Sequence, residues 1–290
     1  MTTTTTTLTA AEEIHALART HSVTYTRSAL DDFGDTITRL SGDDVELDET
    51  EWLLVALERA DQIEGVQATL LHARYLRERD QKPRRAAVVF DPFGDFATRG
   101  YLRNHAGETD LDIVKQLEHR SFQAGLARAM NDIAKGEPVA YADVLATHKT
   151  LFSRIYPWAG TDRMRNATDI AITRPAIPIF SRIPCIPQVL GWALSKGTDQ
   201  DFMRERPGSV MGALAHAHPF LDGNGRTIMV VHHELAARAG IAIAWDQTNK
   251  ADYLQALTEE LQQPEARRLD FYLKPFIREA VERQSATRPC

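Results

Sequence analysis

The sequence contains little cysteine and no long apolar run. Cys185 and Cys290 are the two cysteines in 290 residues, which suits neither a disulfide framework nor the paired spacing of a zinc site. No stretch approaches the 18 or so apolar residues that a membrane-spanning helix needs, and the N-terminus lacks the basic and then apolar order of a signal peptide. We therefore expect a cytoplasmic protein with no membrane partner.

An excess of positive charge is also missing. Lys and Arg total 34 against 40 Asp and Glu, which gives a formal net charge of −6. This balance does not supply the basic surface that nucleic-acid binding requires, so we expect no nucleic-acid partner. A hydrophobic content of 43% over 290 residues is enough for one large globular domain, or for one domain with an extension.

Apolar residues recur at helical spacing through most of the chain, which predicts a mainly α fold. Residues 1–9 form a threonine-rich tract too polar to pack, and we expect a disordered tail there. Residues 48–79 have apolar positions three or four apart and predict one long helix. Further helices are predicted over residues 10–20, 110–135, 141–155, 187–196, 207–217, 228–239, 249–260 and 267–283.

Residues 170–180 break the helical pattern. Isoleucines at positions 170, 172, 177 and 179 alternate with other residues, and two prolines stand among them. This pattern predicts a short β-hairpin at an edge. An exposed hairpin edge can accept a segment of another chain as an added strand, although the hairpin also suits a purely structural role.

The densest set of reactive residues lies at 218–229, which read HPFLDGNGRTIM. Gly223 and Gly225 let the backbone approach a ligand closely, and the helix that follows would direct its N-terminal N–H groups at an anion. Arg226 adds a planar set of donors suited to phosphate oxygens. We infer a phosphate-binding site at this junction, although the same residues also suit an ordinary turn.

Two further residues of this segment indicate phosphate-transfer chemistry. Asp222 is a hard oxygen ligand of the type that holds Mg²⁺ beside phosphates. His218 titrates near neutral pH, so it is a candidate general base for a hydroxyl that attacks phosphorus. A single histidine before Pro-Phe is usually structural, but its combination with a carboxylate, two glycines and an arginine favours a functional role.

Residues 218–229 resemble the signature of the Fic (Fido) family, HxFx(D/E)GNGRxxR, at every fixed position except the last, where this chain has Met229. Residues 148–163 resemble a second Fic motif, a helix that ends in Leu-Phe and is followed by Tyr-x-Trp-Ala-Gly-x-x-Arg. The resemblance implies a Fic helical core with a short β-hairpin flap over residues 136–283. A helical extension would precede it over residues 10–135.

Fic proteins mostly transfer AMP from ATP to a Ser, Thr or Tyr hydroxyl of a target protein. The resemblance therefore implies a protein adenylyltransferase that uses ATP and Mg²⁺. It assigns His218 as the catalytic base and Asp222 as the metal ligand. The residues that it assigns to the donor phosphates are Gly223, Asn224, Gly225 and Arg226.

The resemblance also assigns residues outside the signature. Tyr253 stands where Fic proteins have an aromatic near the nucleotide base, although a tyrosine at helical spacing is more often a core residue. Ile170, Ala171, Ile172 and Thr173 belong to the flap, which would dock the target protein over the histidine. A homodimer is left open.

Residues 60–65, which read ADQIEG, partly resemble the inhibitory motif that some Fic proteins carry in an N-terminal helix, Ser/Thr-x-x-x-Glu-Gly. Ala60 stands where the family has Ser or Thr. The resemblance implies autoinhibition, in which Glu64 blocks the donor pocket by repulsion more than by a salt bridge to Arg226. The alternative is a solvated glutamate beside an incidental glycine.

Met229 leaves the identity of the donor open. In the family the arginine at this position binds the terminal phosphate of ATP and pairs with the inhibitory glutamate, and methionine can do neither. One alternative is therefore a Fic enzyme with another diphosphate-containing donor, such as UTP or a CDP-linked alcohol. The other is a Fic-fold binding or regulatory protein with weakened catalysis.

Overall fold

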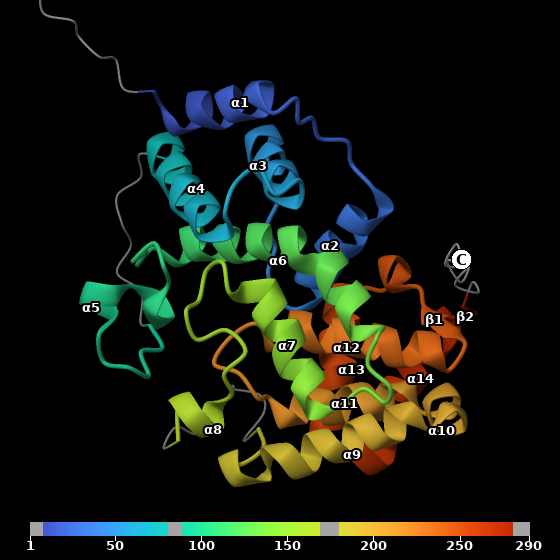
Figure 1. Ribbon diagram of the computed structural model, residues 1–290. Helices are drawn as coiled ribbons and strands as arrows, with labels where there is room; N and C mark the ends of the chain where they lie inside the picture. The colour runs from blue at the N-terminus through green and yellow to red at the C-terminus, as the bar shows by residue number, and fades with distance from the viewer. Residues whose placement is uncertain (1–7, 81–88, 169–179, 281–290) are drawn as a thin grey trace, which may run out of the picture.

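Helices make up nearly all of the regular structure (Figure 1), which confirms the predicted mainly α fold. The computed structural model describes residues 8–80, 89–168 and 180–280. No helix in these ranges combines the length and hydrophobicity needed to cross a membrane. The first helices are α1 (Ala10–Thr20), α2 (Ala29–Leu40), α3 (Glu49–Arg59), α4 (Gly65–Arg79), α5 (Phe96–Arg99), α6 (Leu111–Ile133) and α7 (Tyr141–Phe152). The later helices are α8 (Arg163–Asn166), α9 (Ile186–Thr198), α10 (Gln200–Glu205), α11 (Pro207–Ala217), α12 (Asn224–Arg238), α13 (Lys250–Gln262) and α14 (Arg268–Leu273).

Short elements complete the described chain. Strands β1 (Ile241–Ile243) and β2 (Ile277–Glu279) pair antiparallel, with Ile241 opposite Glu279. The helix predicted over residues 267–283 is therefore wrong for residues 274–280. Pro275 cannot donate the N–H that a continuing helix needs, and the chain extends to pair with β1. The 3₁₀ turns are Tyr101–Arg103, Ile183–Cys185, Trp245–Gln247, Pro264–Ala266 and Lys274–Phe276.

The single helix predicted over residues 48–79 is also wrong, because the chain folds back between α3 and α4. Asp61 in the connecting turn has a φ of 55°. Glu64 caps α4 by accepting a hydrogen bond from the backbone N–H of Gln67 at 3.2 Å. At Gly65 a Cβ would lie 2.6 Å from Cγ of Arg154. The absence of a side chain at Gly65 therefore lets the start of α4 approach the end of α7 closely.

Helix α2 is not predicted by the sequence analysis. Ser28 begins it with a capping box, but Gly34 in its middle would weaken an isolated helix. A Cβ at Gly34 would lie 2.5 Å from the side chain of Gln123, so the glycine lets α2 pack closely on α6. Ile37 and Leu40 are fully buried and join the main core.

The main hydrophobic core contains residues from α2, α4 and α6 as well as from the elements after residue 136. A smaller core joins α1, α3 and α4. Figure 1 shows α6 running between these two parts, with α1, α3 and α4 on one side and α7, α11, α12 and α13 on the other. The domain boundary at residue 136 stays a prediction, and the main core extends across it.

Glu58 forms the polar junction between α3 and the helices beneath it. Its carboxylate pairs with both Arg120 of α6 and Arg154, which follows α7. Arg120 is fully buried and also donates to Oγ1 of Thr69 at 2.7 Å. Burial lowers the pKa of Arg120 to about 9. The N-terminal helices are thus joined to α6 through a buried charge cluster.

Candidate active site

His218 ends α11 in a left-handed conformation, with φ 42° and ψ 59°. A residue with a side chain takes this conformation at a cost, so the surrounding contacts must hold it. The Nε of Arg163 donates to the His218 carbonyl at 2.8 Å, and the Arg163 N–H donates to the carbonyl of Pro219 at 2.8 Å. The imidazole stacks on Phe180, with ring centroids 3.9 Å apart. These contacts fix the direction of the ring.

The Asn224 side chain holds the loop rather than facing outward. Its Oδ1 accepts from the N–H of Phe220 at 2.9 Å, and its Nδ2 donates to the Phe220 carbonyl at 2.8 Å. Nδ2 also lies 3.2 Å from Nε2 of His218. Any contact of Asn224 with phosphate would therefore be made by its backbone N–H, at the start of α12.

The N-terminus of α12 is a cradle of backbone donors. Gly223 precedes it with φ 73° and brings no side-chain cap. Within the described chain, the N–H groups of Asn224, Gly225 and Arg226 have no hydrogen-bond partner, as an anion site at a helix start requires. At Gly225 a Cβ would lie 2.9 Å from Ser41, just after α2. The end of α2 thus lies beside the cradle.

Arg226 is buried and is held by carboxylates from distant parts of the chain. Its Nη2 pairs with Glu118 of α6 at 2.7 Å and with Asp43 at 3.9 Å. Burial alone would lower the pKa of Arg226, but the negative charges of Glu118, Asp43 and Asp222 outweigh it and raise the pKa. Nη1 is buried and has no hydrogen-bond partner among the described residues.

Glu118 lies at the centre of this charged group. Besides Arg226, its carboxylate accepts a hydrogen bond from the Tyr156 hydroxyl at 2.7 Å. Burial and the nearby charge of Asp222 raise the pKa of Glu118 to about 7. Glu118 therefore fixes the guanidinium of Arg226 beneath the cradle.

Asp222 offers a carboxylate at the edge of the same loop. Its Oδ1 accepts from the N–H of Gly223 at 2.7 Å, and its Oδ2 accepts from the Tyr101 hydroxyl at 3.1 Å. Burial raises the pKa of Asp222. The described residues contain no cluster of three metal-binding side chains, but Mg²⁺ beside phosphates needs one or two carboxylates. Asp222 is the carboxylate of this loop that would take that role.

His148 of α7 supports the loop from beneath. Its Nε2 lies 3.1 Å from the Asp222 carbonyl, and the Gly160 N–H donates to its Nδ1 at 2.8 Å. Nδ1 must therefore be the acceptor, and Nε2 carries the proton. The ring also stacks on Phe220 at 3.7 Å. Burial lowers the pKa of His148 to about 3, so the imidazole stays neutral.

Replacing His148 by glutamine is expected to flatten the pH dependence of stability. A buried neutral histidine stabilises the fold fully above its unfolded pKa near 6.5, and this stability is lost as pH falls toward about 3. The largest contribution of His148 to the slope of the free energy of unfolding against pH is about 1.4 kcal/mol per pH unit. Urea unfolding of both proteins at pH 7, 6 and 5 measures it. His232, whose pKa burial also lowers, is present in both proteins and cancels. Parallel curves would contradict the assignment.

Two sequence-based assignments do not belong to this loop, and a third falls outside the described residues. Tyr253 is 2% exposed and packs edge-to-face on Trp245, so it is a core residue rather than a stacking surface for a base. Glu64 is exposed and caps α4, and the acidic partners of Arg226 are Glu118 and Asp43 instead. The flap residues fall within 169–179, outside the described residues. They are Ile170, Ala171, Ile172 and Thr173.

Several residues that shape the site could not be predicted from the sequence. Glu118 and Asp43 lie 100 and 175 positions before the signature, which begins at His218, and Tyr101 lies in a segment predicted only as irregular. Arg163 was noted as part of the second motif without a role. A buried carboxylate among apolar positions of a predicted helix was the available signal for Glu118.

The loop therefore combines a left-handed histidine, an uncapped helix start, a buried arginine and a carboxylate at its edge. Residues 138–236 match the family model described as the Fic/DOC family. This match agrees with the resemblance to the Fic family that the signature residues indicate.

One curated relative is the protein adenylyltransferase VbhT of Bartonella schoenbuchensis, 34% identical over 179 residues. The match covers 58% of this chain and 35% of VbhT, so the chain spans about a third of that relative. The solved structures that resemble the chain include a BepC protein of Bartonella tribocorum with bound AMPPNP, at 21% identity and a TM-score of 0.48. The alignment covers 61% of this chain and 92% of the BepC chain. A Fic domain of Bartonella quintana with bound ADP aligns at 21% identity and a TM-score of 0.44, over 57% of this chain and 87% of that chain.

Proposed function

We propose that this protein is an adenylyltransferase that transfers AMP from ATP to a Ser, Thr or Tyr hydroxyl of a target protein. The observation that carries the proposal is the position of His218 beside the unpaired N–H groups of α12. A candidate base and a candidate anion-binding site thus lie at the two ends of the loop that joins α11 to α12. The name of the curated relative supports AMP as the transferred group.

In the proposed reaction the target hydroxyl oxygen attacks the α-phosphorus of ATP. A new O–P bond forms, and the bond from the α-phosphorus to the bridging oxygen breaks. Pyrophosphate leaves with the electron pair, and the hydroxyl proton passes to the His218 imidazole. The N–H groups at the start of α12 and Nη1 of Arg226 would stabilise the charge that develops on the phosphate oxygens.

Mg²⁺, when bound, would screen the charge of the phosphates, and Asp222 is the residue that would hold it. Tyr101 and the N–H of Gly223 would orient the carboxylate. His148 fixes the backbone at the same residue. Three separate elements would thereby position Asp222 as the metal ligand.

A different nucleotide donor is the second candidate, because Met229 is 1% exposed and packed in the core. It offers no donor to a terminal phosphate. Incubation of the chain with a protein extract and separately labelled ATP, UTP or a CDP-linked alcohol distinguishes the candidates. Label from ATP supports the first proposal, and label from one of the others supports the second. Nucleotide binding without transfer from any donor would contradict both.

We further propose that the end of α2, and not Glu64, restrains the site. Ser41 lies against Gly225, and Asp43 lies 3.9 Å from Arg226 and 3.2 Å from Lys115. A phosphate bound at the cradle would compete with the carboxylate of Asp43 for the same guanidinium.

Replacing Asp43 by alanine is then expected to tighten nucleotide binding about 3- to 10-fold, the equivalent of one weak ion pair. Isothermal titration with a non-hydrolysable ATP analogue measures the change. Asp32→Ala is the matched control, because it removes an exposed α2 carboxylate that pairs with Arg27. Equal affinities for the Asp43 variant and the wild type would refute the restraint.

A further inference from the structure

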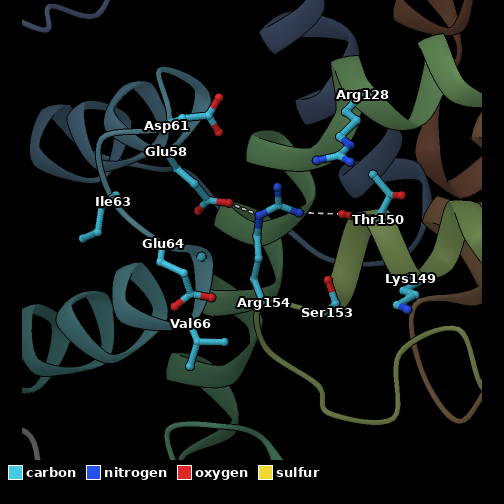
Figure 2. A pocket seen from close by; sticks show the side chains of 11 residues that line it. Glu58, Asp61, Ile63, Glu64, Val66, Arg128, Lys149, Thr150, Ser153 and Arg154 are labelled. Atoms are coloured by element: carbon cyan, nitrogen blue, oxygen red, sulfur yellow. Dashed lines mark hydrogen bonds and ion pairs between the residues drawn. The ribbon is translucent and has the colours of Figure 1, made fainter.

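A pocket of about 470 Å³ lies away from the signature, between the start of α4 and the end of α7. Figure 2 shows side chains from the α3–α4 turn on one side and from α6 and α7 on the other. No residue of the 218–229 segment lines it. Its volume is within the range of pockets that bind small molecules.

The wall formed by α7 is rich in unused donors. The Lys149 ammonium and the Ser153 hydroxyl have no hydrogen-bond or ion-pair partner among the described residues. Arg154 reaches the pocket with its Nε on Glu58 and its Nη1 on the Thr150 carbonyl at 2.5 Å (Figure 2). Its Nη2 remains without a partner in the described chain. These groups line one pocket and can converge on one ligand.

The acidic residues of the pocket are mostly engaged. Glu58 pairs with Arg120 as well as Arg154, so its charge is already balanced. Glu64 caps α4 through the N–H of Gln67, and Asp61 lies in the exposed turn. The cations that line the pocket are Arg128, Lys149 and Arg154. The lining thus carries three cations and three carboxylates, and the carboxylate of Glu58 is shared between Arg154 and the buried Arg120 behind it.

The start of α4 contributes to the same wall. Gly65 and Val66 line the pocket, and the N–H groups of this first turn point out of a 15-residue helix. No hydrogen bond from either N–H is formed within the described residues. A helix start, an ammonium, a guanidinium edge and a hydroxyl together form the donor set that phosphate oxygens take.

We propose that this pocket binds a small molecule that carries a phosphate monoester. The phosphoryl group would lie between Lys149, Arg154 and Ser153, and the rest of the molecule would contact Ile63 and Val66. A dianion is favoured over a carboxylate because several donors converge from two helices. This site is independent of the adenylyltransferase proposal.

Titration of the whole chain with ribose 5-phosphate, followed by backbone amide NMR, tests the proposal, with ribose as the uncharged counterpart. We expect shifts at Gly65, Val66 and Ser153 with the phosphate and none with ribose. Shifts confined to the start of α12, or no shifts at millimolar ligand, would overturn it.

Lys149→Met is expected to weaken ribose 5-phosphate binding about 10-fold, the loss of one exposed charge-assisted contact. Glu64→Gln should tighten it, because a negative charge leaves the rim. Lys196→Met is the matched control, since that lysine lies over the Phe202 ring and does not line the pocket. Circular dichroism checks folding, and Ser153→Ala gives a second, smaller loss if Lys149→Met is misfolded. Wild-type affinity in a folded Lys149→Met would refute the assignment.

Discussion

Replacing His218 by alanine is expected to lower kcat for AMP transfer by a factor of about 10²–10⁴, because general base catalysis contributes that much to proton transfer. The imidazole is held by Phe180 and lies beside Asn224, so its loss removes the base without removing the phosphate cradle. We expect KM for ATP to stay within a few-fold of the wild-type value. Steady-state transfer of labelled AMP measures both constants.

His216→Ala is the matched control, since it removes a half-buried histidine two positions earlier on the same helix. We expect it to retain most of the transfer. Unchanged kcat in His218→Ala would exclude His218 as the base. Loss of nucleotide binding together with kcat would mean that His218 holds the loop together rather than acting on the proton.

Replacing Glu58 by alanine is expected to lower the free energy of unfolding by about 3–5 kcal/mol, the cost of leaving a buried charge without its partner. Arg120 is fully buried and would keep only its contact to Thr69. Arg154 would also lose its ion pair with Glu58, but its guanidinium reaches solvent at the pocket and can be hydrated there. Urea unfolding at neutral pH measures the change.

The double variant Glu58→Met with Arg120→Met should recover most of this loss, because apolar residues of similar volume replace a buried ion pair with little cost. Asp132→Ala, at an exposed pair with Lys135, should change the free energy of unfolding by less than about 1 kcal/mol. If Glu58→Ala resembled Asp132→Ala, the buried cluster would not hold the N-terminal helices.

The sequence predicted the histidine at position 218 and a helix over residues 228–239, because both belong to one local motif, although α12 begins earlier, at Asn224. It did not predict which carboxylates form ion pairs with Arg226. Glu118 and Asp43 reach it from α6 and from the end of α2, and a contact across 100 or more residues leaves no local pattern. Met229 was identified correctly as a residue with no phosphate donor to offer.

The incorrect predictions for α2, for the break between α3 and α4 and for Tyr253 arise because local sequence patterns do not report tertiary packing. Helix α2 was missed because Gly34 and several Asp and Thr residues have low helix propensity, and packing on α6 stabilises it. The break between α3 and α4 was missed because apolar spacing continues on both sides of the turn. Tyr253 has helical spacing, which cannot separate a core tyrosine from one that would stack on a base.

Helix α6 carries Glu118 and Arg120 two positions apart, and they face different parts of the molecule. Glu118 holds the arginine of the cradle, whereas Arg120 holds Glu58 of the N-terminal helices. A fragment beginning at residue 136 would therefore expose core positions and lose the partner of Arg226. The smallest piece expected to fold alone is longer than the family match at residues 138–236, and it must begin upstream of α6.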